Sequence, residues 1–347
     1  MKLGTTDISA IKLGSTDISK AYLGNSVVYE SGPDYSEPFY IEDINGSDNT
    51  LTIKKNSSSA STLTIEKSLD GTNWSSMGST STTGITATVP ANGKLYLRCS
   101  TDTWGKYAGS WTYYYNSINC SGRFNTGGNI MSLLYGSNFT GEETTFPSGS
   151  TYTFYNLFNG ATTLVSAENL LLPAMVLTTC CYQYLFNGCS SLTTAPALPA
   201  TTLDSNCYNS LFYHCTSLTT APALPATSLA YRCYYSLFSG CSSLTTAPEL
   251  PATSLAQYCY SYIFSGCTSL NYIKVGFTAW PNMSSSSASD YQSTSYWTKL
   301  SVNTTGTFVC PAALSQEFNA SGNNTGGTSS ISGYTNAIPY GWTVQTY

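Results

Sequence analysis

The feature that most constrains this chain is a 26-residue repeat in its middle. Two cysteine series recur at a step of 26, and the residues between them hardly change from copy to copy. A fixed period of this length predicts a solenoid, in which each unit buries its apolar face only against the next unit. The two series are Cys181, Cys207, Cys233 and Cys259, and Cys189, Cys215, Cys241 and Cys267.

A degenerate copy precedes the first of these units. It is visible in TFYNLFNGATTLVSAENLLLPAMVLTTC, which keeps the order of the marker residues of the later copies. We therefore expect the stacking to begin before Cys181. The replacements are Phe158, Gly160, Leu164 and Pro173 for Phe186, Gly188, Leu192 and Pro199.

Each unit is expected to contain one short helix and one short strand. Cys233, Leu237 and Cys241 lie at i, i+4 and i+8, which predicts one apolar face of a two-turn helix. The segment SLTTAPELP that follows is extended, because its prolines exclude helix. Equivalent apolar residues would then form core ladders along the solenoid. These ladders are Phe186, Phe212, Phe238 and Phe264; Leu192, Leu218, Leu244 and Leu270; and Cys189, Cys215, Cys241 and Cys267.

The end of each predicted helix carries a glycine such as Gly240, where a positive φ is commonly needed. In the copy before, the same place is taken by His214, the only histidine of the chain. Histidine is among the few non-glycine residues enriched at positive φ, so we interpret His214 as structural. The alternative, a functional imidazole, has no carboxylate or nucleophile near it in the sequence.

Few residues of the chain are charged. Charged residues make up 9% of the 347 positions, against roughly 25% in ordinary soluble proteins, and the 28 tyrosines add to a neutral, hydroxyl-rich composition. A net charge of −5 without a Lys/Arg cluster argues against nucleic acid as a partner. The sequence also shows neither an apolar run long enough to span a membrane nor a signal peptide, so we expect no membrane insertion and assembly in the cytoplasm.

The twelve cysteines allow three interpretations. Free cysteine is a small, readily buried residue, and we expect most of these thiols to be reduced and to fill core positions. A second possibility is a set of disulfides, one candidate being Cys99 with Cys120. A third, a metal site, lacks the paired CxxC spacing that zinc sites normally show.

No arrangement of residues points to catalysis. The adjacent Glu142 and Glu143 suggest a solvated loop rather than a catalytic pair, and no phosphate-binding loop is present. We therefore expect a non-enzymatic protein without a cofactor or a metal. The candidate ligand-facing residues are tyrosines that recur beside the first cysteine of each unit, and these either seal the edge of the core or form an exposed aromatic strip. They are Tyr182, Tyr208, Tyr234 and Tyr260.

The N-terminal residues 1–30 carry a shorter repeat of period ten, seen in KLGTTDISAI and KLGSTDISKA. The pattern predicts short strands joined by glycine-containing turns. These strands either add to the edge of the next domain or form a segment for docking and oligomerisation. The candidate docking residues are Leu3, Ile8, Leu13, Ile18 and Leu23. Residues 31–38 form a proline-containing linker.

Period-two alternation of apolar and polar residues then predicts a small antiparallel β-sandwich over 39–117, with Trp74 and Trp104 in its core. The sandwich is interpreted as a spacer, with sugar binding as the alternative. Residues 118–150 are expected to cap the solenoid at 151–275. The last segment, 276–347, is predicted to be a β-rich cap with Trp280, Trp297 and Trp342 in its core. The fold class is thus multidomain and β-rich.

The repeat LFSGCSSLTTAPELPATSLAQYCYSYIFSGCTSL resembles the bacterial leucine-rich repeats called BspA-like, which carry an AFxxCxxLxxIxIP-type signature. Cys241 and Leu244 match its Cys and Leu, whereas Ala247 and Pro248 depart from the usual strand Ile. The resemblance covers roughly residues 150–275. Such repeats occur on bacterial surface proteins and on virion proteins of phages of gut anaerobes, crAss-like phages included.

The N-terminal units and the ending GTFV with PYGWTVQ look like the phage set. The resemblance implies a fibre, spike or capsid decoration protein of the virion. We expect its N-terminus to bind other virion proteins, its chains to form a homo-oligomer such as a dimer or trimer, and its solenoid to adhere to host surface polysaccharide. A bacterial cell-surface adhesin is the second hypothesis, and a carbohydrate-active enzyme is the third.

Overall fold

The computed structural model describes residues 33–280, 293–294, 296–298, 303–314, 338–339 and 342–347, together with six short strands among the first 32 residues. The chain divides into two compact units, Met1–Tyr35 and Ser36–Tyr347. It is β-rich, and the helical elements of the described part are short: one α-helix of a single turn, one 3₁₀ turn and the helical residues 312–314.

The first unit consists of three separate two-stranded hairpins. Each copy of the ten-residue repeat supplies both strands of one hairpin, so the expected short strands are confirmed. Among the described residues these strands pair only with each other. Edge strands and a docking segment both stay predictions for this unit. The pairs are β1 (Lys2–Leu3) with β2 (Thr6–Asp7), β3 (Ile11–Leu13) with β4 (Thr16–Ile18), and β5 (Lys20–Leu23) with β6 (Ser26–Glu30). Leu3, Leu13, Ile18 and Leu23 lie in these strands, and Ile8 lies outside the described residues.

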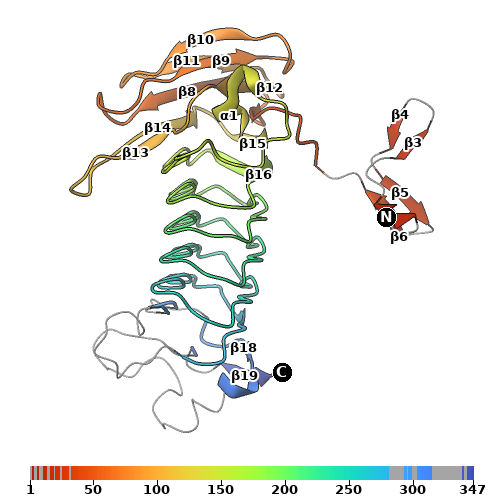
Figure 1. Cartoon of the computed structure of the whole chain (residues 1–347), viewed down its shortest axis with the longest axis vertical. Helices are drawn as coiled ribbons and strands as arrows, with labels where there is room; N and C mark the ends of the chain where they lie inside the picture. The colour runs from red at the N-terminus through yellow and green to blue at the C-terminus, as the bar shows by residue number, and fades with distance from the viewer. Residues whose placement is uncertain are drawn as a thin grey trace. The chain divides into compact units, whose positions relative to one another are not determined.

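The second unit begins with two sheets packed face to face (Figure 1). One has the strand order β10-β9-β12-β7-β15-β16 and the other the order β11-β8-β14-β13. Every pairing in them is antiparallel except that of β15 with β16. The strands are β7 (Tyr40–Asp43), β8 (Asn49–Lys55), β9 (Thr64–Ser68), β10 (Ser75–Ser79), β11 (Ile85–Val89), β12 (Lys94–Cys99), β13 (Gly105–Tyr107), β14 (Tyr113–Cys120), β15 (Phe124–Asn129) and β16 (Leu164–Leu171).

Alternation along the strands places the apolar residues between these sheets. In β8, Leu51 and Ile53 are buried while the residues between them are more exposed. Trp104 is also buried and donates a hydrogen bond from Nε1 to the Leu133 carbonyl, as its predicted core position requires. The prediction for Trp74 was wrong. Its ring is only half-buried, and it lies under the guanidinium of Arg98 at 4.4 Å on the outer side of the sheet.

The sandwich and the repeat region share one sheet. β15 pairs with β7 of the sandwich in antiparallel fashion and with β16 of the first repeat copy in parallel fashion. The boundary expected after residue 117 falls within β14, so the first part of the predicted cap, through β15, lies in the sheets of the sandwich. The remaining elements here are α1 (Ser132–Tyr135) and η1 (Gly136–Asn138).

Beyond β16, the 26-residue units lie one upon another (Figure 1). Their backbone amides bond alternately within a unit and between units. The N–H of Tyr208 donates to the carbonyl of Cys233 in the next unit at 3.1 Å, and the N–H of Leu211 donates to Tyr208 three residues earlier at 3.2 Å. Each unit therefore supplies hydrogen-bond acceptors to the unit before it.

The helix predicted in each unit is wrong, because this segment is a run of four-residue turns. Every fourth residue has a positive φ, as at Arg232 (53°), Ser236 (53°) and Gly240 (80°). An α-helix would show no such residue and would bond each amide to the carbonyl four positions back. The predicted positive φ at His214 is confirmed, at 57°. The equivalent positions in other units are Tyr152, Asn156, Gly160, Cys180, Tyr184, Gly188, Asn206, Ser210, Tyr258, Tyr262 and Gly266.

The predicted core ladders form inside this stack. The phenylalanine rings lie nearly parallel, with centroids of Phe212 and Phe238 5.6 Å apart, and the leading copy joins the column through Phe158 and Phe186 at 5.5 Å. All the ladder residues are fully buried. Each ladder cysteine donates its thiol hydrogen to a phenylalanine carbonyl of the unit before, as Cys241 Sγ does to Phe212 at 3.1 Å.

The expected strand of each unit is reduced in the inner copies to single bridges, such as Thr220 with Thr246. The prolines that follow cannot donate to a ladder, which limits its length. Regular pairing returns at the C-terminal end, where β17 (Tyr272–Lys274), β18 (Thr307–Cys310) and β19 (Thr343–Thr346) form a parallel sheet. Near it, Trp297 and Trp342 are buried and Trp280 is partly buried against the same core.

Candidate functional site

The four tyrosines predicted to face a ligand lie inside the stack. Tyr182, Tyr208, Tyr234 and Tyr260 are at most 1% exposed. Their rings form a second stacked column, with centroids of Tyr208 and Tyr234 5.9 Å apart. The exposed-strip interpretation is therefore wrong, and the tyrosines fill the core.

A signal for this burial was present in the sequence. Tyr234 precedes Phe238 by four residues, and residues four apart lie on the same side of the unit. The buried position of Phe238 therefore indicates a buried position for Tyr234. In the leading copy the tyrosine position is occupied by Phe154, which stacks on Tyr182 at 5.9 Å. The hydroxyl groups of the four tyrosines are buried without a hydrogen-bond partner among the described residues. Burial raises the pKa of Tyr208 well above its ordinary value.

All twelve cysteines are free thiols and buried, so the disulfide between Cys99 and Cys120 is not formed. Burial raises the pKa of Cys233 to about 12, and it raises the pKa of Cys215 and Cys241 well above the ordinary value. Thiols that stay protonated at neutral pH are poor nucleophiles and poor metal ligands. Within the described part of the chain, His, Cys, Asp and Glu side chains form no group of three that could hold a metal ion.

His214 packs against the edge of the Tyr213 ring, with ring centroids 4.2 Å apart. Its ring also fills the space beside Gly240 of the next unit, where an added Cβ would lie 2.6 Å from Nδ1. His214 forms no ion pair with any residue that the structure describes. These contacts support the structural interpretation of this residue.

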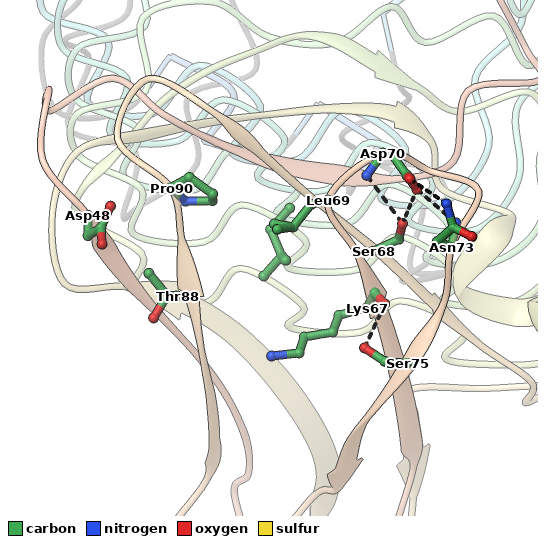
Figure 2. A pocket seen from close by; sticks show the side chains of 10 residues that line it. Asp48, Lys67, Ser68, Leu69, Asp70, Asn73, Ser75, Thr88 and Pro90 are labelled. Atoms are coloured by element: carbon green, nitrogen blue, oxygen red, sulfur yellow. Dashed lines mark hydrogen bonds between the residues drawn. The ribbon is translucent and has the colours of Figure 1, made fainter.

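A pocket of about 520 Å³ lies between the two sheets of the sandwich (Figure 2). Its walls come from β9, β10, β11 and β12 and from the loops beside them. Because these segments are separated by up to half of the sandwich sequence, no local motif could reveal the pocket. The lining residues are Asp48, Lys67, Ser68, Leu69, Asp70, Asn73, Ser75, Thr88, Pro90 and Leu95.

The pocket combines polar groups of both signs with an apolar wall. Figure 2 shows the Lys67 side chain extending across the pocket from β9, with Thr88 and Asp48 on the facing wall. The Lys67 ammonium has no ion-pair partner among the described residues, and Leu69 is 64% exposed at the pocket. Such a mixture can donate and accept hydrogen bonds and contact a C–H surface, which is what a sugar ring requires.

The second carboxylate of the pocket, that of Asp70, accepts hydrogen bonds from residues of its own turn. Its Oδ1 accepts hydrogen bonds from the backbone N–H of Asn73 at 2.7 Å and of Thr72 at 2.8 Å, and from the Ser68 hydroxyl. The backbone N–H of Asn73, with these other donors, holds the pKa of Asp70 well below its ordinary value. Asp70 therefore stays ionised and shapes the pocket rim rather than acting as an acid.

A shallower groove of about 600 Å³ runs along the Ala/Pro segments of neighbouring units. It is lined mainly by alanines and prolines, with Glu168 at one end. The groove has few hydrogen-bonding side chains, so it offers less chemical selectivity than the sandwich pocket.

Comparison with protein-family models, with curated proteins and with solved structures gave no match. Among the described residues, no helix has both the length and the apolar character needed to cross a membrane.

Proposed function

We propose that this chain is a non-enzymatic virion structural protein of a phage, a fibre or capsid decoration protein of the head or tail. In this proposal the repeat stack is a leucine-rich-repeat-like solenoid that adheres to glycan on the host surface. The N-terminal hairpins attach the chain to other virion proteins, and the chain forms a homo-oligomer whose several copies increase avidity.

The observation that carries the proposal is the distribution of reactive groups in the stack. The cysteines and the four ladder tyrosines are all buried with raised pKa, which leaves a hydroxyl-rich exterior with few charges. A large surface of this kind suits contact with a neutral or weakly charged polymer better than chemistry at one centre. The sandwich pocket, with Lys67, Asp48 and Leu69, adds a second place where a sugar unit would fit.

The location of the chain tests the proposal directly. Antibody raised against the purified chain should label particles released from a culture that produces it, as seen by immunogold electron microscopy. Labelling of the bacterial envelope with no labelling of particles would contradict a virion protein and would favour a cell-surface adhesin. Turnover of a purified polysaccharide by the chain would contradict the non-enzymatic assignment.

A further inference from the structure

Arg232 is the only arginine or lysine between positions 151 and 270, and it is half-buried on the edge of the stack. Three tyrosine rings surround its guanidinium. The guanidinium carbon lies 5.1 Å from the ring centroid of Tyr231, 5.2 Å from that of Tyr235 and 4.6 Å from that of Tyr258. Tyr231 and Tyr235 come from the same unit as Arg232, and Tyr258 comes from the next. Cation–π contacts of this kind hold the planar group in one orientation.

Among the residues that the structure describes, none is recorded as a hydrogen-bond acceptor or ion-pair partner of this guanidinium. Arg232 forms no ion pair among the described residues, and its Nε is buried without a hydrogen-bond partner. A buried charged donor without an acceptor is costly, and an oxyanion that accepts from it recovers that free energy. The planar fork of arginine matches the two oxygens of a carboxylate.

The same chain contains the completed version of this arrangement. In the sandwich, the guanidinium of Arg98 lies 4.4 Å from the ring of Trp74, and its Nε donates to Glu66 at 2.7 Å. Arg98 thus has both an aromatic partner and a carboxylate from the protein. At Arg232 the aromatic partners are present and the carboxylate is not, so an outside group would complete the site.

The tyrosines around Arg232 extend along the edge of the stack. The ring of Tyr235 contacts that of Tyr262 at 5.5 Å, and Tyr262 stacks on Tyr296 at 4.9 Å. Arg232, Tyr258, Tyr262 and Tyr296 all have positive φ, between 52° and 58°. These are the left-handed positions of the four-residue turns, which recur in every unit.

We propose that Arg232 with Tyr231, Tyr235 and Tyr258 recognises a carboxylate-bearing sugar unit of a polysaccharide. The carboxylate would accept from the guanidinium, and the C–H face of the sugar would pack on the tyrosine rings. A single cation suits one carboxylate per binding unit, whereas a nucleic acid backbone would require several cations. This inference gives a ligand class to the glycan adhesion that we propose above, and so rests on that proposal.

The test is a binding titration of the full chain against oligosaccharides that carry galacturonate, glucuronate or sialic acid. At least one of them should bind, and its methyl ester should not. Arg232→Gln should weaken binding by roughly tenfold to a hundredfold, since a charged hydrogen bond is lost. Arg232→Lys keeps the charge without the planar fork and should also bind more weakly. Arg123→Gln, which changes the net charge equally at an exposed position, is the matched control and should bind like the unaltered chain.

Equal melting temperatures of the unaltered chain and Arg232→Gln would establish that the variant is folded; if they differ, Arg232→Lys serves as the folded variant. The inference is overturned if none of the acidic oligosaccharides binds, if acid and ester bind equally, or if the Arg232 variants bind normally. Binding of sulfated oligosaccharides or polyglutamate in place of the carboxylated sugars would also overturn it. Antibody labelling of particles tests the proposed function separately, because particles can be labelled whether or not Arg232 binds a carboxylate.

Discussion

The sandwich and the repeat stack bury their apolar side chains in different ways. In the sandwich, unlike residues from distant strands meet between two sheets, and the core depends on the whole set of strands. In the stack, a residue meets its own equivalent one unit away, as Phe212 meets Phe238. Stability in the stack is therefore expected to be a sum of nearest-neighbour terms, whereas stability in the sandwich is shared across the domain.

The two regions also treat polar groups differently. The sandwich pairs some of its charges, as Lys94 does with Glu37 at 2.7 Å, and it gives the buried Trp104 a hydrogen-bond acceptor. The inner units of the stack have few charges to pair, and their buried titratable groups are mainly thiols and tyrosine hydroxyls. The stack thus depends on these groups remaining neutral.

Alkaline pH should produce the largest difference between the two regions. Burial raises the pKa of Cys233 and Cys267 to about 12, from an ordinary value of 9.0. The pKa of each thiol is higher in the folded chain than in the unfolded chain. As the pH rises, the thiols of the unfolded chain therefore lose their protons first. The stabilisation is complete below pH 9 and is lost as the pH rises toward 12, by about 1.4 kcal/mol per pH unit for each thiol.

A ladder of four such thiols should lose stability more steeply than a single thiol, because each buried thiol resists the ionisation that the unfolded chain undergoes. The stack, which holds most of the cysteines, should unfold before the sandwich as the pH is raised. Alkylation of the stack cysteines, located by peptide mapping, reports unfolding of the stack, and alkylation of Cys99 and Cys120 reports unfolding of the sandwich. Simultaneous transitions at both probes, or rapid thiol alkylation of the folded chain at pH 8, would contradict the difference.

Truncation of a ladder ring should have the next largest effect. Phe212→Ala removes a fully buried ring between Phe186 and Phe238, and it should lower the free energy of unfolding by about 3 to 5 kcal/mol. Chemical denaturation measures this loss. Phe139→Ala, at a partly buried position outside the stack, is the control and should cost much less. Equal losses in the two variants would contradict the importance of the ladder.

Removal of one buried polar atom should give smaller effects of opposite sign in the two regions. Tyr208→Phe deletes a hydroxyl with no partner among the described residues, so the free energy of unfolding should rise by about 1 kcal/mol. Trp104→Phe deletes the N–H that donates to Leu133 together with part of the buried indole ring, so the free energy should fall by about 1 kcal/mol or more. Thermal melts of both variants measure whether stability rises or falls. A loss of stability in Tyr208→Phe would show that its hydroxyl is satisfied.

The sequence allowed prediction of the stacked units because the same core residues recur at the same positions of every unit. The period of 26 identified the Phe, Leu and Cys ladders and even the leading copy with Phe158. It could not distinguish the run of turns from a helix, because both place residues four apart on one side. The available signal was the strict four-residue spacing at Cys233, Leu237 and Cys241, which the 3.6-residue period of a helix does not match.

Other features depend on contacts that no local pattern records. β10 (Ser75–Ser79) has the sequence SSMGS, which lacks apolar alternation, so the strand was not predicted. The sandwich pocket joins Asp48 to Lys67 and Thr88 across two sheets. The site at Arg232 needs Tyr258 from the next unit, and its position is known only once the stacking register is known.

The central claim is that equivalent side chains of consecutive units stabilise each other directly. A double-mutant cycle between Phe212→Ala and Phe238→Ala measures this coupling, and a cycle between Phe212→Ala and Phe264→Ala provides the comparison two units apart. We predict a coupling of about 0.5 to 1.5 kcal/mol for the adjacent pair and about zero for the distant pair. Additive effects in the adjacent pair, or equal coupling in both pairs, would contradict the stacked arrangement.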